Sequence, residues 1–206
     1  ERALQKLWTD FGVDHTKSVA DFCVIFGREA PVIVEIGFGN GAALAATALA
    51  QPQKNFLGIE VHRPGIGYLL RRLQMNATQN VRVLQADAND IFSAWVPDRS
   101  LAAVNIFFPD PWPKKRHNKR RLVQTDFCAL IQRKLKPGGH VHVATDWRDY
   151  AEHMLTVLSQ TPGLVDVTHN ENFLAYIASR PQTKYEQRGQ RLGHEVTDLI
   201  FQCYEN

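Results

Sequence analysis

Short apolar runs alternate along the chain with longer segments in which apolar residues recur at helical spacing. The runs are rich in valine, isoleucine and phenylalanine, so the pattern is typical of strands joined by crossover helices. The predicted strands are residues 32–36, 56–61, 81–85, 102–108, 140–145, 164–168 and 196–204. The predicted helices are residues 18–26, 42–50, 64–75, 90–95, 123–135 and 147–158. Because the early strands are almost wholly apolar, as parallel strands covered on both faces are, we predict a doubly wound α/β fold with a seven-stranded, mostly parallel sheet.

The two ends of the chain depart from this alternation. The last predicted strand follows its predecessor without an obvious long helix between them, so we expect it to pair antiparallel with its neighbours. Apolar residues before the first strand predict an N-terminal arm that packs on the core. Since no repeat or linker divides the chain, we expect one domain over residues 1–206, with an arm and helix over 1–30 and an α/β core over 31–206.

Composition narrows the class of protein. A chain of 206 residues with 44% hydrophobic and 22% charged residues can bury one ordinary core, which excludes disordered and collagen-like proteins. Neither a signal peptide nor a membrane-spanning run of about 20 apolar residues is present, so we expect no membrane partner and a cytoplasmic location. The three cysteines, Cys23, Cys128 and Cys203, are widely spaced in apolar surroundings, which predicts buried thiols in a reducing compartment and no metal site.

Positive charge is concentrated in one segment. Six of the 24 basic residues lie between Lys114 and Arg121, whereas acidic residues outnumber basic ones in the rest of the chain. A mildly acidic body with one basic segment indicates a polyanionic partner more strongly than a uniformly basic chain would.

Each of five successive predicted strands has a carboxylate at or just after its carboxyl end. A parallel sheet binds its ligands beyond the carboxyl ends of the strands, where the winding direction reverses. A single acidic residue at such an end is usually a solvated loop residue, but five in series indicate a ligand crevice. These residues are Glu35, Glu60, Asp87, Asp110 and Asp146.

A glycine-rich loop follows the first strand, and its spacing is ambiguous. Gly37, Gly39 and Ala42 fit the dinucleotide-binding pattern, and Glu60 stands near the place of its ribose-binding acid. S-adenosylmethionine also carries a ribose diol that such an acid can bind. Glu35 favours the methyl donor, because a carboxylate at this point would repel a pyrophosphate but suit a cationic amino-acid group.

The most specific segment is residues 107–117, FFPDPWPKKRH. Its alternate prolines stiffen the backbone, so that Asp110 and Trp112 are held at the rim of the sheet directly before the basic run. A proline-rich turn that leads into a solvated basic helix is the alternative interpretation. A nuclear-import signal would account for the charges, but not for Asp110 and Trp112.

Four motifs together resemble those of the bacterial tRNA (guanine-N(7)-)-methyltransferase family, over essentially the whole chain. They are residues 35–41 (EIGFGNG), 58–60 (GIE), 109–117 (PDPWPKKRH) and 183–186 (TKYE). The resemblance implies a Rossmann-like enzyme that transfers a methyl group from S-adenosylmethionine to N7 of the guanosine at position 46 in the variable loop of tRNA. S-adenosylhomocysteine would be the product, and no metal would be needed.

The resemblance also implies roles for individual residues. Asp110 would be catalytic. The expected cofactor-binding residues are Glu35, Gly37, Gly39, Gly41, Glu60, Asp87 and Asp110. The expected substrate-binding residues are Lys114, Asp146, Thr183, Lys184, Tyr185 and Glu186. The expected RNA-binding residues are Arg116, His117, Asn118, Lys119, Arg120 and Arg121.

Several alternatives stay open at this point. Trp112 and Tyr185 can each stack on the target base or pack in a turn, and Asp110 can act electrostatically or as a late proton acceptor. The competing functions are an S-adenosylmethionine enzyme with another substrate and an RNA-binding module without catalysis. For the oligomeric state, we expect a monomer.

Overall fold

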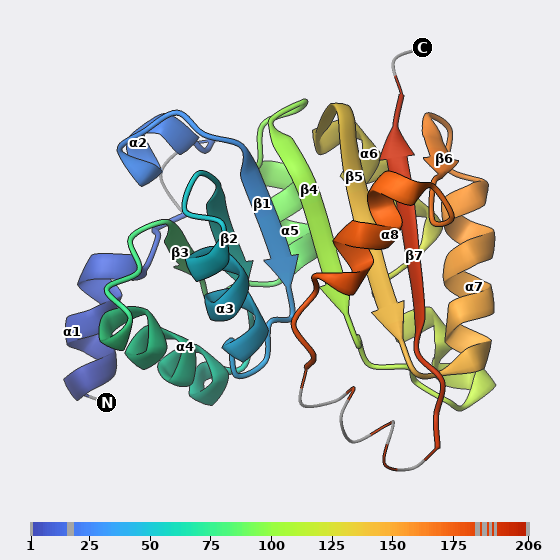
Figure 1. Ribbon diagram of the computed structural model, residues 1–206, viewed down its shortest axis with the longest axis horizontal. Helices are drawn as coiled ribbons and strands as arrows, with labels where there is room; N and C mark the ends of the chain where they lie inside the picture. The colour runs from blue at the N-terminus through green and yellow to red at the C-terminus, as the bar shows by residue number, and fades with distance from the viewer. Residues whose placement is uncertain are drawn as a thin grey trace.

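The computed structural model describes residues 2–15, 19–183, 186, 189, 191 and 193–204. Its centre is a seven-stranded sheet with the strand order β3-β2-β1-β4-β5-β7-β6 (Figure 1). β1 to β5 are parallel, and β7 pairs antiparallel with both β5 and β6. The strands are β1 (Val32–Ile36), β2 (Asn55–Ile59), β3 (Val81–Leu84), β4 (Leu101–Phe107), β5 (Leu135–Thr145), β6 (Leu164–Asp166) and β7 (Thr197–Cys203). The predicted fold class and the antiparallel last strand are confirmed.

Helices cover both faces of the sheet (Figure 1). α3, α4 and α8 lie in front of the strands in this view, and α5 and α6 lie behind them. The helices are α1 (Arg2–Phe11), α2 (Phe22–Phe26), α3 (Ala42–Ala50), α4 (Arg63–Met75), α5 (Ala88–Ala94), α6 (Thr125–Lys134), α7 (Arg148–Ser159) and α8 (Glu171–Ala178), with the 3-10 helix η1 (Lys115–Arg120).

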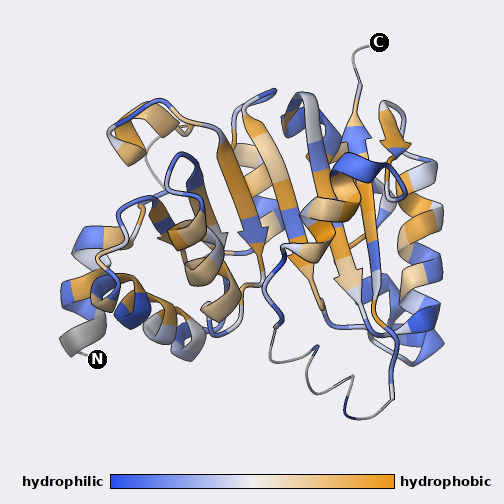
Figure 2. Ribbon diagram, viewed as in Figure 1, coloured by the Kyte–Doolittle hydropathy of each residue, from blue (hydrophilic) through white to orange (hydrophobic). Residues whose placement is uncertain are grey.

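Two apolar cores result, one on each face of the sheet. Alternate residues of β1 divide between them, because successive side chains of a strand point to opposite faces. Ile33 packs with α1, α3 and α4, whereas Val34 and Ile36 pack with α5, α6 and α7. Figure 2 shows the apolar strands at the centre and the polar outer turns of the helices. No helix in the described part of the chain is long and apolar enough to cross a membrane.

The N-terminal arm packs on the core as we expected, and it forms the helix α1, whose Leu7 and Phe11 are buried with residues of α4. The structure corrects two other expectations about the elements. The short helix α8 lies between β6 and β7, where we expected no long helix and predicted no short one. Its Phe173 and Tyr176 pack on His140 of β5, but a helix of eight residues is too short to show a clear helical period in the sequence.

The helix expected over residues 18–26 begins only after its N-cap, Asp21. Its Cys23 is exposed, so the expectation of a buried thiol is wrong there, whereas Cys128 and Cys203 are buried.

The strand order positions the site. The winding direction reverses between β1 and β4, which are hydrogen-bonded neighbours, and this reversal is where such sheets bind ligands. The carboxyl ends of all five parallel strands meet at one edge, the lower edge in Figure 1. Gly189 and His194, which precede β7, lie at the same edge beside Asp146.

Candidate functional site

The glycine loop after β1 has the backbone shape that only glycine adopts without strain. Gly37, Gly39 and Gly41 have φ angles of 71°, 58° and 69°. A Cβ atom built on Gly37 would meet nothing within 4 Å, whereas one on Gly41 would collide with Leu69 of α4. The loop is therefore closely packed on its α4 side and open beside Gly37, where a ligand can approach the backbone.

Glu60 braces this loop. Its carboxylate accepts hydrogen bonds from the backbone N–H groups of Gly39 at 2.9 Å, Val61 at 2.8 Å and His62 at 2.9 Å. A carboxylate has about four acceptor positions, so it can still accept a ligand hydroxyl. The sequence predicted a ribose-binding role for Glu60 but gave no sign of its role in holding the glycine loop.

Glu35 is a buried acid near the end of β1. Glu35 is 5% exposed, and this burial raises the pKa of its carboxyl to about 7, although the positive charge of Arg180 opposes the shift. The register places Glu35 beside Asn105 of β4, and Asn105 beside His142 of β5, so three buried polar residues form a row across the sheet. A cationic group beside a buried carboxyl stabilises its ionised form. Glu35 therefore fits the ammonium group of S-adenosylmethionine.

Asp87 and Asp110 reach the edge from β3 and β4. Asp87 is exposed and caps α5, because its carboxylate accepts from the backbone of Asn89 at 2.8 Å. Asp110 is also exposed, and it lies three residues after β4. The edge therefore carries carboxylates on both sides of the reversal point.

Left-handed residues hold the segment around Asp110 in an unusual shape. Phe108 and Trp112 have φ angles of 51° and 44°, which bulky residues rarely adopt, and each precedes a proline. The backbone is tied at several points. Phe108 donates to the carbonyl of Ala144 on β5 at 2.7 Å, and Arg121 donates to the carbonyl of Pro111 at 2.9 Å. Asp110 is thus presented by a fixed turn.

The basic segment forms η1 and packs on Trp112. The guanidinium of Arg120 lies 5.0 Å from the centre of the indole ring, and the His117 ring meets it edge-on at 5.9 Å. In the amide orientation that gives both the oxygen and the nitrogen of Asn118 suitable hydrogen-bond partners, its nitrogen donates to the carbonyl of Trp112 at 3.0 Å. These contacts favour the packing role of Trp112. Lys114, Arg116 and Lys119 are exposed beside it.

Arg121 differs from the other basic residues. Its side chain is 1% exposed, pairs with Asp149 of α7 and lies over the ring of Tyr150 at 4.8 Å. The arginine therefore joins the Asp110 turn to α7. We leave it out of the surface that faces RNA.

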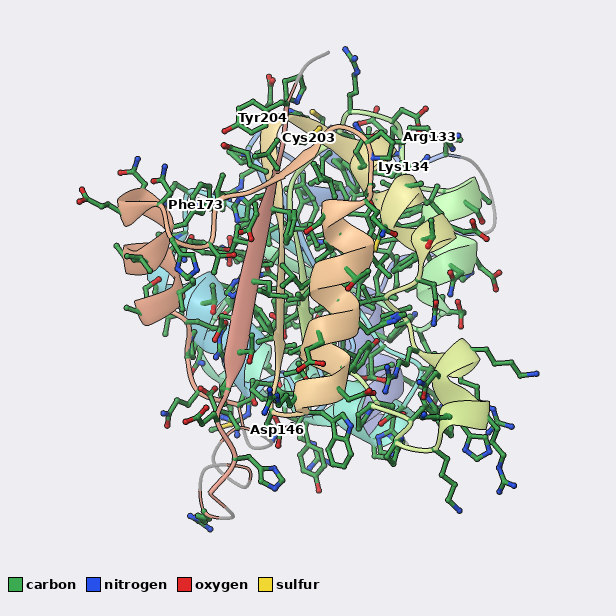
Figure 3. All side chains as sticks on the ribbon, turned by 90° about the vertical axis from the view of Figure 1, so that its right-hand side faces the viewer. Arg133, Lys134, Asp146, Phe173, Cys203 and Tyr204 are labelled. Atoms are coloured by element: carbon green, nitrogen blue, oxygen red, sulfur yellow. The ribbon has the colours of Figure 1, made fainter. Side chains whose placement is uncertain are left out.

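Asp146, two residues after Ala144, is covered by the chain that precedes β7. His194 contacts its carboxylate through Nδ1 at 3.2 Å, and a Cβ on Gly189 would come within 2.5 Å of the same oxygen. Figure 3 places Asp146 at the end of the molecule opposite Arg133 and Tyr204. Of the residues between α8 and β7, Gly189 and His194 thus lie against Asp146.

Thr183 and Glu186 bond to each other in a reciprocal pair. The Glu186 backbone donates to the Thr183 hydroxyl at 3.1 Å, and the Thr183 backbone donates to the Glu186 carboxylate at 3.3 Å, the geometry of a capping box. Glu186 is also buried and bound to Arg180. Its carboxylate is therefore engaged within the protein. Lys184 and Tyr185 lie outside the described residues.

Sequence reasoning missed Arg180 entirely. This buried arginine contacts residues of three separate elements, yet it stands alone in the sequence, outside the basic run. No local pattern marks such a residue, because its partners come together only in the fold. As for metals, the described residues contain no group of three or more histidine, cysteine or acidic residues that could hold an ion.

Comparisons with known proteins identify relatives over nearly the whole chain. A family model described as "Putative methyltransferase" matches residues 29–199. Two curated proteins named tRNA (guanine-N(7)-)-methyltransferase, from Salmonella typhimurium strain LT2 and Escherichia coli strain K12, are each 50% identical to it, covering 98% of this chain and 84% of theirs.

Solved structures share the fold at low sequence identity. The 16S rRNA methyltransferase KamB matches with a TM-score of 0.62 and 13% identity, covering 92% of this chain and 96% of that one. Phosphoethanolamine N-methyltransferase 2 of Haemonchus contortus, in complex with S-adenosyl-L-methionine, matches with a TM-score of 0.53 and 14% identity, over 100% of this chain and 56% of that one.

Proposed function

The chain belongs to the tRNA (guanine-N(7)-)-methyltransferase family, and from this premise we propose that it methylates the guanosine at position 46 in the variable loop of tRNA. As a member of this family it is an S-adenosylmethionine-dependent enzyme that acts on N7 of guanine in tRNA. The observation that carries the proposal is the fixed Asp110 turn, which follows β4 beside the glycine loop of β1 and leads into basic η1. We propose that residues 1–206 act as one methyltransferase domain, as a monomer, in the cytoplasm.

We assign the cofactor to the glycine loop and the acids around it. Glu35 would pair with the ammonium of the methionine part, Glu60 would accept a ribose hydroxyl, and Asp87 would lie at the far side of the site. Gly37 and Gly39 would let the ligand approach the backbone. S-adenosylmethionine supplies a methyl group on a positively charged sulfur.

Guanine N7 needs little activation by the protein. Its lone pair lies in the plane of the ring outside the aromatic system, so no side chain has to remove a proton before the methyl group is attached. The protein must instead hold the base in line with the methyl donor, and such alignment can contribute about 7 kcal/mol or more. The base must also be drawn at least partly out of its tertiary contacts in the folded tRNA.

Asp110 is placed to act on the base. Methylation puts positive charge on guanine, and a carboxylate next to it stabilises that charge in a site from which water is excluded. Asp110 and Asp146 follow neighbouring strands, so either carboxylate can accept the N1–H and N2–H donors that only guanine offers together. Adenine would leave this acceptor unpaired. The Glu186 carboxylate is bound to Arg180, so it acts through the position of its segment.

The η1 surface would bind the tRNA backbone. Lys114, Arg116, Lys119 and Arg120 lie within or beside one short helix at the same edge as Asp110. Clustered lysine and arginine neutralise phosphates and read little sequence, so this surface would orient the tRNA without selecting the base. Base selection would then belong to the carboxylates.

A matched pair of tRNAs tests the position of the methyl group. Unmodified tRNA transcripts with guanine or adenine at position 46 would be incubated with the enzyme and labelled S-adenosylmethionine. We expect 7-methylguanosine in the first transcript and no label in the second. Reductive cleavage at 7-methylguanosine would map the site, and cleavage at any other position would overturn the assignment to the variable loop.

A further inference from the structure

Arg180 occupies the centre of a buried ionic cluster that no step described above uses. Its guanidinium bonds to Glu186 at 2.7 and 3.1 Å and to Asp198 of β7 at 3.1 and 3.2 Å. Its side chain is 7% exposed, and those of the two acids are 8% and 13% exposed. Two carboxylates therefore share one buried cation.

The same guanidinium lies against the start of the Asp110 turn. It sits 5.2 Å from the ring centre of Phe107 and 5.7 Å from that of Phe108, the left-handed residue two positions before Asp110. Asp198 in turn bonds to His142 of β5 at 2.7 Å. One side chain thus contacts the turn that carries Asp110, the segment that carries Glu186 and the beginning of β7.

Arginine suits this position for a geometric reason. Its planar group has five N–H donors in a fixed fork, so it can bind two carboxylates and stack on aromatic rings at the same time. Lysine would restore the charge but not the fork. A buried ion pair adds little net stability after desolvation, and such pairs are better attested as devices that fix one arrangement of the chain.

We propose that Arg180 is a positioning residue for methyl transfer, which fixes Glu186, and Thr183 bonded to it, relative to the Asp110 turn. This inference rests on the proposed function. It assigns Arg180 no contact with substrate or cofactor. Glu186 acts in the same way, as the partner through which Arg180 holds the segment.

The test compares three arginine variants under single-turnover conditions. Arg180→Met removes the charge, and Arg180→Lys keeps the charge but loses the fork. Arg82→Met is the matched control, since Arg82 is also partly buried, donates to the carbonyl of Ile25 and lies over a ring, that of Phe26, away from the site. For each variant the methylation rate would be measured in a single turnover and the KM for tRNA in the steady state. The affinity for S-adenosylhomocysteine and the melting temperature would be measured separately.

We expect the Arg180 variants to lose methylation rate rather than affinity for tRNA or cofactor. Misplacement of a catalytic group can lower a rate about 100-fold, so we expect about this loss in Arg180→Met and at least about a tenfold loss in Arg180→Lys. The KM for tRNA and the cofactor affinity should change less than about threefold in Arg180→Lys. Arg82→Met should lower the melting temperature and leave the rate within about twofold of wild type.

A double-mutant comparison tests whether Arg180 acts through Glu186. If it does, Arg180→Lys combined with Glu186→Gln should lower the rate hardly more than the stronger single variant. Additive losses would overturn the proposal, as would an Arg180→Lys enzyme with the wild-type rate. Should Arg180→Met fail to fold, the Arg180→Lys comparison decides. A wild-type enzyme that forms no 7-methylguanosine would instead refute the proposed function.

Discussion

At the scale of single residues, Glu60 combines two roles, and both predict weaker cofactor binding when it is replaced. Glu60→Ala removes the acceptor for a ribose hydroxyl and the brace of the Gly39 loop. Loss of such buried hydrogen bonds costs about 1.5 to 3 kcal/mol, so we expect the affinity for S-adenosylhomocysteine to fall about tenfold to 100-fold. Titration calorimetry measures this change directly.

Asp90 provides the control for Glu60. It is an exposed acid in the first turn of α5, just after β3. Asp90→Ala therefore removes one negative charge from the same edge of the sheet without altering the glycine loop. We expect Asp90→Ala to keep its affinity within about twofold, because an exposed charge is well screened. Unchanged affinity in Glu60→Ala would remove Glu60 from the cofactor site.

At the scale of elements, the strands were predictable because each is an apolar run, and all seven lie where the sequence placed them. β1 and α3 have the predicted bounds, whereas β5 begins five residues earlier than predicted, at Leu135. η1 and α8 were not predicted as defined helices. η1 consists almost wholly of basic residues and shows no apolar stripe, whereas α8 has only eight residues, too few to establish a helical period.

For the basic element η1, we predict a change in the salt dependence of tRNA binding. Replacing Arg116, Lys119 and Arg120 together with alanine removes up to three phosphate contacts. Each such contact contributes about 0.7 to 0.9 to the slope of log affinity against log salt, so the slope should flatten by about two. Cofactor affinity should stay unchanged, because the three side chains lie outside the glycine loop.

The matched control for η1 lies at the opposite edge of the sheet. Replacing Arg99, Arg133 and Lys136 with alanine removes the same charge from exposed positions. Figure 3 shows Arg133 at the end of the molecule far from Asp146, the Arg99 backbone donates to the Arg133 carbonyl, and Lys136 is the second residue of β5. This variant should keep the wild-type slope. Equal slopes in both triple variants would show that η1 is an ordinary solvated surface.

At the scale of the whole molecule, the strand order explains why the location of the site was predictable and its internal contacts were not. Parallel strands end at one edge, so acids that follow them gather there, whatever the details of packing. The contacts of Arg180 join Glu186, six residues later, with Asp198 of β7 and with Phe107 of β4, which is far away in the sequence. Only the complete fold brings these residues together, so the sequence alone predicted Glu186 as a substrate-binding residue without its ion pair.

The stability of the folded molecule should depend on pH through Glu35. Its pKa is raised from 4.5 to about 7 by burial, so the folded state keeps the proton that the unfolded state loses. The contribution of Glu35 to stability is therefore fully present below about pH 4.5 and is lost as the pH rises to about 7. A shift of this size corresponds to roughly 3 kcal/mol at most.

Glu35→Gln isolates this contribution. Denaturant unfolding of both proteins between pH 4.5 and 8 gives the difference in their free energies of unfolding, in which the effects of other groups cancel. Arg180, Tyr176 and Asn105 surround Glu35 and stay the same in both. We expect wild type to lose stability relative to Glu35→Gln as the pH rises. A difference that does not change with pH would refute the raised pKa.

The central claim is that Asp110, presented at the carboxyl edge beside the cofactor loop, supports methylation of guanine N7 in tRNA. The most direct measurement is methyl transfer from labelled S-adenosylmethionine to unmodified tRNA, with the nucleoside product identified, for wild type and Asp110→Ala. We expect 7-methylguanosine from wild type and loss of most turnover in Asp110→Ala, with cofactor affinity largely kept. A different methylated nucleoside, or full turnover by Asp110→Ala, would contradict the account.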